Sequence, residues 1–208
     1  MRNPIDHLTE GLPHGWRVTI DWLVTIVGAI AIVLAIKAWV VNPYRIPSSS
    51  MEPTLHCARP DTGCEARFSD RVLACRFCYR FWSPKRDDII VFNTPPRAAQ
   101  ECGGPGGVFV KRLIGLPGET WEERDGYVYI NGKRLDEPFI DPHYRDTQTI
   151  KPMKIPAGQY FMMGDNRVGS CDSRRWGTVP RGNLIGKVVA TYWPPQRISI
   201  QAIIGRLL

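Results

Sequence analysis

Residues 18–41 read VTIDWLVTIVGAIAIVLAIKAWVV, and this apolar stretch decides how the chain is organised. No charge interrupts its centre, and Trp22 and Trp39 lie near its two ends, as tryptophans do at membrane interfaces. About 20 helical residues are enough to cross a hydrocarbon core of roughly 30 Å. The sequence therefore predicts a short segment over residues 1–17, a transmembrane anchor over residues 18–41 and one domain over residues 42–208.

The same stretch has two other interpretations, a cleavable signal peptide and a helix buried in a soluble core. A signal peptide begins with a short basic stretch and ends on a small-x-small site. Here residues 1–17 are mixed and no such site closes the run, so we expect a retained anchor. Its orientation is not set by charge, because Arg2 and Arg17 on one side are matched by Lys37 and Arg45 on the other.

The composition is that of a globular protein, with 43% hydrophobic and 23% charged residues in a chain of 208, which excludes a mainly disordered chain. The net charge of +7 suits a surface near anionic lipid or nucleic acid. The arginines are scattered rather than clustered on an aromatic-rich motif, so no nucleic-acid partner is expected.

After the anchor the sequence predicts a mainly β domain of antiparallel strands. Short β-rich runs between turn residues occupy residues 71–73, 88–92, 108–114, 127–130, 159–163 and 184–192. Asn131-Gly132 predicts a type I′ hairpin turn after the fourth run. Residues 57–68 and 95–107 are predicted as loops, and residues 200–208 are the one later stretch with a helical pattern.

Two segments carry residues suited to nucleophilic catalysis. A serine needs a base within hydrogen-bond reach, and none of the four histidines lies inside a patterned segment: His7, His14, His56 and His143. Residues 46–55 read IPSSSMEPTL, and residues 109–118 read FVKRLIGLPG, in which Lys111 interrupts an apolar strand. Burial lowers the pKa of a lysine, so that the neutral amine can act as a base. The alternative is an edge-strand lysine that faces solvent.

Together with residues 163–177, MGDNRVGSCDSRRWG, these segments resemble the three signature boxes of type I signal peptidases, in that family's order. These are bacterial membrane-bound serine proteases with a Ser/Lys dyad. The resemblance implies an antiparallel all-β catalytic domain of the signal peptidase type. It also implies a single-pass protein of the bacterial cytoplasmic membrane, with residues 1–17 cytoplasmic and residues 42–208 extracytoplasmic.

The resemblance assigns the nucleophile to Ser50 and the general base to Lys111, with the Ser48 hydroxyl and the Ser50 N–H as donors to the oxyanion. In the third box it assigns a serine that orients the lysine, an ion pair that supports the site and a glycine that permits close approach: Ser170, Asp172 with Arg174, and Gly164. The positions that match the family's substrate pockets are Tyr44, Ile46, Leu55, Phe109 and Val110. Ordinary core packing is the alternative for these five apolar residues.

The implied activity is an endopeptidase that removes signal peptides from exported preproteins by cutting after a small-x-small (Ala-x-Ala) site. Signal peptides, the lipid bilayer and the protein export machinery are the expected partners, and no metal or organic cofactor is expected. The alternative is a catalytically silent, membrane-anchored binding or scaffold protein, against which the presence of both Ser50 and Lys111 argues.

The chain departs from the family's commonest pattern at Ser49, where many members have Gly, and at Cys171, where a small apolar residue is common. The pairing of the six cysteines is left open by the sequence. A bridge between Cys57 and Cys64 and one between Cys102 and Cys171 are the first interpretations. Cys75 and Cys78 can pair only if a turn separates them. A zinc site is the alternative for four of the cysteines: Cys57, Cys64, Cys75 and Cys78.

Overall fold

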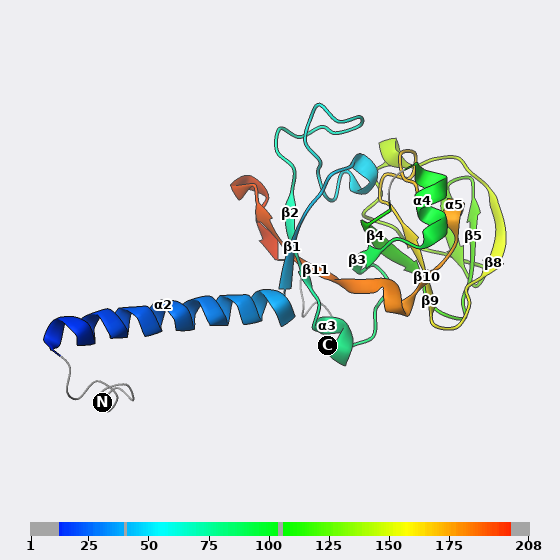
Figure 1. Cartoon of the computed structure of the whole chain (residues 1–208). Helices are drawn as coiled ribbons and strands as arrows, with labels where there is room; N and C mark the ends of the chain where they lie inside the picture. The colour runs from blue at the N-terminus through cyan, green and yellow to red at the C-terminus, as the bar shows by residue number, and fades with distance from the viewer. Residues whose placement is uncertain (1–12, 40, 104–105, 201–208) are drawn as a thin grey trace. The chain divides into compact units, whose positions relative to one another are not determined.

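The structure is a computed structural model that describes residues 13–39, 41–103 and 106–200. The chain divides into two compact units, Met1–Val41 and Asn42–Leu208. The described part of the first unit is dominated by one long helix, and the second is built mainly of antiparallel strands (Figure 1).

The helix of the first unit is α2 (His14–Trp39). The carbonyl of Pro13 accepts the N–H of Trp16, so the helix begins before the predicted start of the apolar run. By length and composition the part His14–Ala35 can cross a membrane, and none of it is buried within the protein. This exposure argues against the interpretation as a core helix, because a core helix buries its apolar face.

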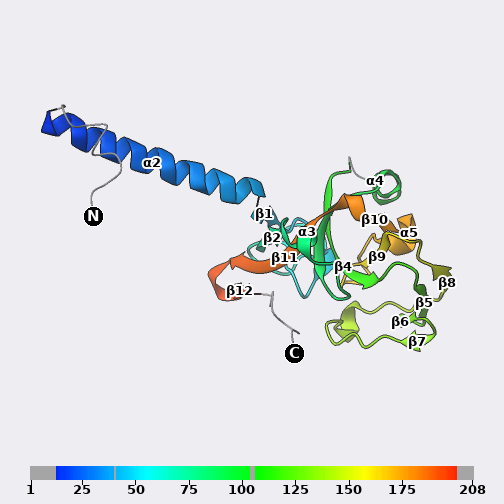
Figure 2. The same cartoon turned by 90° about the horizontal axis from the view of Figure 1, so that it is seen from below.

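The second unit contains two antiparallel sheets. The larger sheet has the strand order β1-β2-β11-β3-β4-β9-β10, with β12 paired to β11, and the smaller one has the order β7-β6-β5-β8. In Figure 2 the strands of the smaller sheet lie together at one end of the unit. The strands of the larger sheet are β1 (Val41–Arg45), β2 (Arg71–Cys75), β3 (Ile89–Asn93), β4 (Val108–Gly115), β9 (Gln159–Met163), β10 (Val179–Pro180), β11 (Leu184–Trp193) and β12 (Ser199–Ile200). Those of the smaller sheet are β5 (Thr120–Arg124), β6 (Tyr127–Ile130), β7 (Lys133–Arg134) and β8 (Ile150–Lys154).

All six predicted strands are confirmed, and so is the hairpin. Ile130 of β6 lies opposite Lys133 of β7. The two residues between them, Asn131 and Gly132, have positive φ angles of 52° and 77°, as a type I′ turn requires. The sequence does not predict β1, β5 and β8, because prolines interrupt β1 and β8 and charged residues fill much of β5.

The prediction of a loop over residues 95–107 is wrong for its first half, which forms α4 (Pro96–Cys102). Pro96 stands in the first turn and Gly103 caps the end at a φ of 66°, which is the usual order of these two residues at helix ends. Seven residues are too few to show an amphipathic period. The helix predicted over residues 200–208 lies outside the described residues from position 201 on, and Ile200 belongs to β12.

The remaining described helices are short and lie between strands. They are η1 (Ser49–Met51), α3 (Cys78–Phe81), η2 (Pro142–Tyr144), α5 (Ser173–Trp176), η3 (Arg181–Asn183) and η4 (Pro195–Arg197). Helices α4 and α5 lie side by side (Figure 1), and the disulfide Cys102–Cys171 joins the end of α4 to the segment before α5.

The alternative prediction of a zinc site is wrong, because the four cysteines form two disulfides. These are Cys57–Cys64 and Cys75–Cys78. Cys75 ends β2 and Cys78 begins α3, so a turn separates them and brings their Cα atoms to 5.5 Å. Within a continuous strand the two side chains would face opposite sides of the sheet.

The smaller sheet is joined to the larger one through a shared apolar core. Trp121 of β5 stacks on Phe161 of β9 with ring centroids 4.1 Å apart. A separate cluster contains Ile46, Met51 and Leu55, and it packs the segment around residue 50 onto strands β2, β3 and β11. Of the segments suited to catalysis, residues 46–55 are therefore packed on the larger sheet, and residues 109–118 contribute strand β4 to it.

Gly126→Ala is expected to destabilise the protein more than Gly132→Ala. Both glycines have φ near +76°, so both variants lose about 1 kcal/mol from the left-handed backbone. A Cβ at position 126 would also collide with the carbonyl oxygen of Asp146, whereas position 132 is open. That collision costs roughly 1–3 kcal/mol more. Thermal unfolding of the full chain in detergent measures the difference, and equal melting temperatures for the two variants would contradict it.

Candidate active site

Ser50 lies in a short 3-10 turn between an exposed segment and the apolar core. Its Oγ is 3.2 Å from the Oγ of Ser48, so the two hydroxyls are within hydrogen-bond distance. Met51 next to it is fully buried, and the N–H of Glu52 donates to the carbonyl of Ser49 at 3.0 Å. The turn is therefore fixed by its neighbours while Ser48 stays exposed beside it.

Asn166 binds this turn to the third sequence segment. Its N–H donates to the carbonyl of Ser50 and its Nδ2 to the carbonyl of Ser49, both at 3.2 Å. Its own Oδ1 accepts the N–H of Gly169 at 2.8 Å. Asn166 has no role predicted from the sequence, because its contacts are to backbone atoms and leave no residue-type signal.

Gly164 lies where the third segment meets the turn that carries Ser50, which we call the Ser50 turn. A Cβ at this position would collide with the carbonyl oxygen of Ser50 and with the Oγ of Ser170. The Ser170 Oγ is itself buried and has no hydrogen-bond partner among the described residues. Only glycine permits this approach, and it brings Ser170 next to the turn that carries Ser50.

Lys111 lies in the middle of β4, opposite Ile90 of β3, and η1 packs against the same strand. Its side chain is 4% exposed, and its Nζ lies 5.6 Å from the centre of the Phe109 ring. Burial lowers the pKa of Lys111 to about 8, against the opposing effect of the carboxylates of Asp172 and Asp165. About one tenth of the amine is then neutral at pH 7. Within the described chain Lys111 forms a hydrogen bond with neither Ser50 nor Ser170.

Asp172 and Arg174 form the ion pair that the resemblance implies. Arg174 donates from Nε to Oδ1 and from Nη2 to Oδ2 of Asp172, both at 2.9 Å. Asp172 Oδ2 also accepts the N–H of Gly164 at 3.1 Å. Burial alone would raise the pKa of Asp172, but Arg174 and these hydrogen bonds hold it below its ordinary value.

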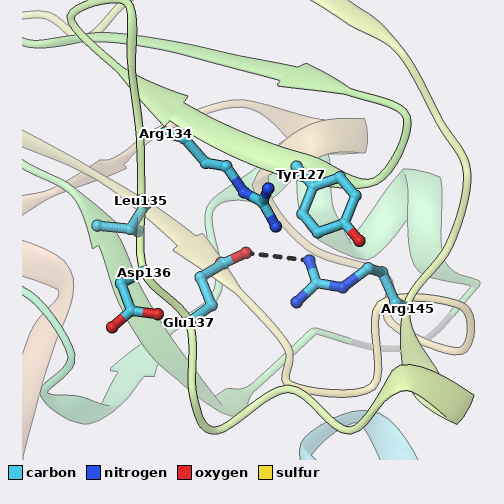
Figure 3. A pocket seen from close by; sticks show the side chains of 6 residues that line it. All are labelled: Tyr127, Arg134, Leu135, Asp136, Glu137 and Arg145. Atoms are coloured by element: carbon cyan, nitrogen blue, oxygen red, sulfur yellow. Dashed lines mark hydrogen bonds and ion pairs between the residues drawn. The ribbon is translucent and has the colours of Figure 1, made fainter.

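A second arginine holds the other side of Gly164. Arg167 is buried, its Nε donates to the Gly164 carbonyl at 3.0 Å, and its Nη2 lies 2.5 Å from Glu137. Glu137 also pairs with Arg145 at 3.3 Å, and both line a cavity of about 350 Å³ (Figure 3). Together with Asp172, Arg167 fixes both the N–H and the carbonyl of Gly164.

A further ion pair connects all three segments. Arg112 donates to both oxygens of Asp165, from Nε at 2.8 Å and from Nη2 at 2.6 Å. Thr54 donates to the same carboxylate at 2.5 Å. Arg112 follows Lys111, Thr54 comes after the Ser50 turn, and Asp165 follows Gly164. The Arg112–Asp165 pair, with Thr54 bound to it, therefore holds the three segments together. None of these three residues has a role predicted from the sequence.

The five apolar residues expected to line substrate pockets differ in exposure. Ile46 and Leu55 are buried in the core cluster that also contains Met51. Tyr44 and Val110 pack against this cluster while remaining partly exposed. Phe109 packs against a different cluster on the face of β4 that carries Lys111.

Among the described histidines, His56 is the one closest in sequence to Ser50, and it is ion-paired. Its Nδ1 lies 2.5 Å from Glu52. The hydrogen bond to Glu52 raises the pKa of His56 above its ordinary value despite partial burial. His143 and His14 are exposed, and His7 lies outside the described residues.

Comparison with known proteins identifies the family. The family model described as "Signal peptidase, peptidase S26" matches residues 19–193. The chain belongs to this family. The signal peptidase is 39% identical over 178 residues to probable signal peptidase I-2 of Synechocystis sp., covering 85% of this chain and 74% of that protein. It is 38% identical over 173 residues to signal peptidase I of Leptolyngbya laminosa, covering 82% and 78%.

A solved signal peptidase I from Enterococcus faecalis aligns with 51% of this chain and 97% of its own, at 35% identity and a TM-score of 0.42. Membership confirms the predicted family, and the mainly β fold agrees with that prediction. This signal peptidase is thus an enzyme that removes signal peptides, and the silent-scaffold interpretation is not retained.

Asn166→Ala is expected to lower kcat by about 10- to 100-fold with little change in KM, because it releases the Ser49 carbonyl and loosens the Ser50 turn. Asn183→Ala is the matched control, since Asn183 also donates its Nδ2 to a backbone carbonyl, that of Asn93, at 2.9 Å. Peptide cleavage kinetics of both variants measure the effect. An equal loss in both, or a change in KM alone, would argue against a positioning role.

Lys111→Met is expected to raise the free energy of unfolding at pH 7, because the folded state then buries no ammonium group. A pKa of about 8 against the ordinary 10.5 corresponds to roughly 3 kcal/mol. The cost of burying charged Lys111 is complete below pH 8 and falls as pH approaches the pKa of the unfolded lysine. The increase in the free energy of unfolding that Lys111→Met brings therefore shrinks toward pH 10. Unfolding midpoints between pH 7 and 10 measure it, with the exposed Lys151→Met as control. Parallel pH curves for the two variants would disprove the burial argument.

Proposed function

We propose that Ser50 and Lys111 are the nucleophile and general base of this signal peptidase, and that it cuts preproteins after a small-x-small site. The burial of Lys111, with a pKa lowered to about 8, is the observation that carries the proposal. A lysine in water is almost fully charged at neutral pH and has no lone pair to offer. A buried lysine on the strand against which the Ser50 helix η1 packs is a suitable base.

The reaction follows from these groups. Neutral Lys111 Nζ takes the Ser50 Oγ proton while Oγ attacks the scissile carbonyl carbon. The tetrahedral oxyanion accepts hydrogen bonds from the Ser48 hydroxyl and the Ser50 N–H, and each such donor contributes roughly 3 kcal/mol. The Lys111 ammonium then gives its proton to the leaving amine, and an ester remains on Ser50. A water molecule, deprotonated by Lys111, hydrolyses this ester and restores the serine.

The third segment orients the base. Ser170 has a buried hydroxyl without a partner in the described chain, and it lies against Gly164 next to the Ser50 turn. A hydrogen bond between the Ser170 hydroxyl and Lys111 Nζ would hold the amine toward Ser50. The Asp172–Arg174 pair supports this arrangement through the N–H of Gly164.

The substrate segment binds extended beside the site, in the manner of an added strand. Tyr44, Phe109 and Val110 are the partly exposed residues that contact its small side chains, and Ile46 and Leu55 form the floor beneath them.

We place the enzyme in the bacterial cytoplasmic membrane, with α2 as its anchor, residues 1–17 cytoplasmic and residues 42–208 outside. Three disulfides in the second unit support an oxidising compartment. Cleavage sites emerge at this membrane surface, where the protein export machinery is the expected partner.

The test compares cleavage of a preprotein-derived Ala-x-Ala peptide by wild type, Ser50→Ala and Lys111→Ala in detergent and lipid. Both variants are expected to lose at least about 1,000-fold in kcat. Ser49→Ala and Lys151→Ala, which remove a neighbouring hydroxyl and an exposed amine, serve as controls for each.

The pH dependence is a second readout of the same experiment. Wild-type kcat/KM is expected to rise about tenfold per pH unit below pH 8 and to level off above it, because only neutral Lys111 is active. Full cleavage by folded Lys111→Ala, or an ascending limb near pH 6, would reject the lysine as base.

A further inference from the structure

A cavity at the smaller sheet holds two arginines that the proposed reaction does not use. We call it the Arg134 cavity. Its volume is about 350 Å³, and small-molecule sites in proteins have volumes of about 300–1,000 Å³. The residues that line it come from β6, from β7 and from the loops that follow: Tyr127, Arg134, Leu135, Asp136, Glu137 and Arg145. Figure 3 shows the side chains of both arginines directed toward the Tyr127 ring.

Arg134 brings an unneutralised guanidinium group to this cavity. Its guanidinium carbon lies 3.8 Å from the centre of the Tyr127 ring. Its side chain is exposed and forms neither an ion pair nor a hydrogen bond with any described residue. A guanidinium group that contacts an aromatic ring through its flat face still has its N–H donors directed outward around its edge. These donors are therefore available to a ligand in the cavity.

Arg145 is fixed at one nitrogen and free at the others. Its Nη1 donates to the carbonyl of Gly126 at 2.8 Å and lies 3.3 Å from Glu137. Its guanidinium carbon lies 4.5 Å from the centre of the same Tyr127 ring. Nε and Nη2 have no hydrogen-bond partner in the described part of the chain. Because both guanidinium groups lie against one ring, a single small ligand can reach the free donors of both.

Positive charge exceeds negative charge on this side of the cavity. Glu137 is the buried acid, and it is shared between Arg145 and Arg167, whose Nη2 lies 2.5 Å from it. One carboxylate neutralises one of these two arginines, and Arg134 adds a further positive charge. Asp136 also lines the cavity, but it is exposed, and in Figure 3 its carboxylate points away from both guanidinium groups. The free donors are therefore suited to an anion.

The shape and number of these donors favour phosphate among small anions. A guanidinium group binds two oxygens of a phosphate at once through its forked N–H donors. A phosphate has enough oxygens for two such groups, and its charge near pH 7 approaches −2. A carboxylate has two oxygens and one charge, so it can use one guanidinium fork fully but not both.

We propose that the Arg134 cavity binds the phosphate group of a small water-soluble molecule, either inorganic phosphate or a phosphate monoester. Arg134 and the free nitrogens of Arg145 donate hydrogen bonds to the phosphate oxygens. Glu137 stays on Nη1 of Arg145 and holds that guanidinium group in place. The site is separate from the proposed dyad, and the inference depends neither on the dyad nor on the cleavage site.

The first test measures binding of inorganic phosphate to the full-length Ser50→Ala protein in neutral detergent at about pH 7.5. Calorimetry at constant ionic strength is expected to show one site with a Kd of roughly 1 mM or lower. Arg134→Gln should weaken binding at least about tenfold. Arg124→Gln is the matched control, because Arg124 also lies on a tyrosine ring, that of Tyr129 at 4.5 Å, but pairs with Glu122 and does not line the cavity. Its Kd should change by less than about twofold.

Removal of the exposed acid is expected to act in the opposite direction. Asp136→Asn takes away a negative charge that repels an anion, so it should tighten phosphate binding about two- to threefold. Asp61→Asn, which removes an exposed acid that does not line the cavity, should leave the Kd unchanged. Equal tightening in both variants would mean that phosphate responds to the overall charge of the chain, and would overturn the proposal.

The second test locates the ligand. Modification of arginines by phenylglyoxal is followed by mass spectrometry of peptides from the same protein. Phosphate at ten times its Kd is expected to slow the modification of Arg134 about fivefold or more and to leave that of Arg124 unchanged. Equal protection of both arginines, or of neither, would overturn the proposal.

Two further ligands identify what the cavity accepts. Tighter binding of glycerol 1-phosphate than of inorganic phosphate would mean that an organic group fills the remaining space. Equal binding would mean that the phosphate alone is recognised, and both results support the proposal. Acetate binding as tight as phosphate binding, or no saturable phosphate binding at all, would overturn it. None of these measurements depends on cleavage, so a failure here is distinct from a failure of the dyad.

Discussion

The approach of two chain segments at Gly164 is the constraint on which the candidate site depends. No side chain fits between the Ser50 carbonyl and the Ser170 hydroxyl, so these groups meet only because residue 164 has no Cβ. Asp172 holds the N–H of this glycine and Arg167 holds its carbonyl. Because both polar groups of Gly164 are hydrogen-bonded, its peptide units are held in one orientation. The Ser50 turn, which packs against Gly164, is positioned by it.

These contacts to Gly164 require charges to be buried where the smaller sheet meets the third segment. Arg174 reaches Glu123 and Asp146 in addition to Asp172, and Arg167 reaches Glu137. Burial raises the pKa of Glu123 to about 7, although Arg174 opposes this effect. Removing one member of such a network leaves an uncompensated buried charge, which costs several kcal/mol. The smaller sheet therefore supports the site although it contributes none of the proposed catalytic groups.

The sequence predicted the strands whose apolar pattern is continuous and the hairpin whose turn chemistry is explicit. It missed β5, because two buried glutamates interrupt its apolar pattern, and Glu123 is buried against Arg174, which is distant in sequence. It missed α4, which is too short to show a period. The candidate catalytic residues came from the family resemblance. Asn166, Arg112 and Glu137 could not be found in the same way, because their importance lies in contacts that exist only after folding.

The contacts that shape the Ser50 turn have a consequence for the order of events during synthesis. Ser50 is made early, but the backbone and side-chain amides of Asn166 that hold its turn are made more than half a chain later. Contacts so distant in sequence form late, because a long loop must close first. A nascent chain therefore carries Ser50 before its turn is held in place, and the candidate site forms only after the segment with Asn166 has been made.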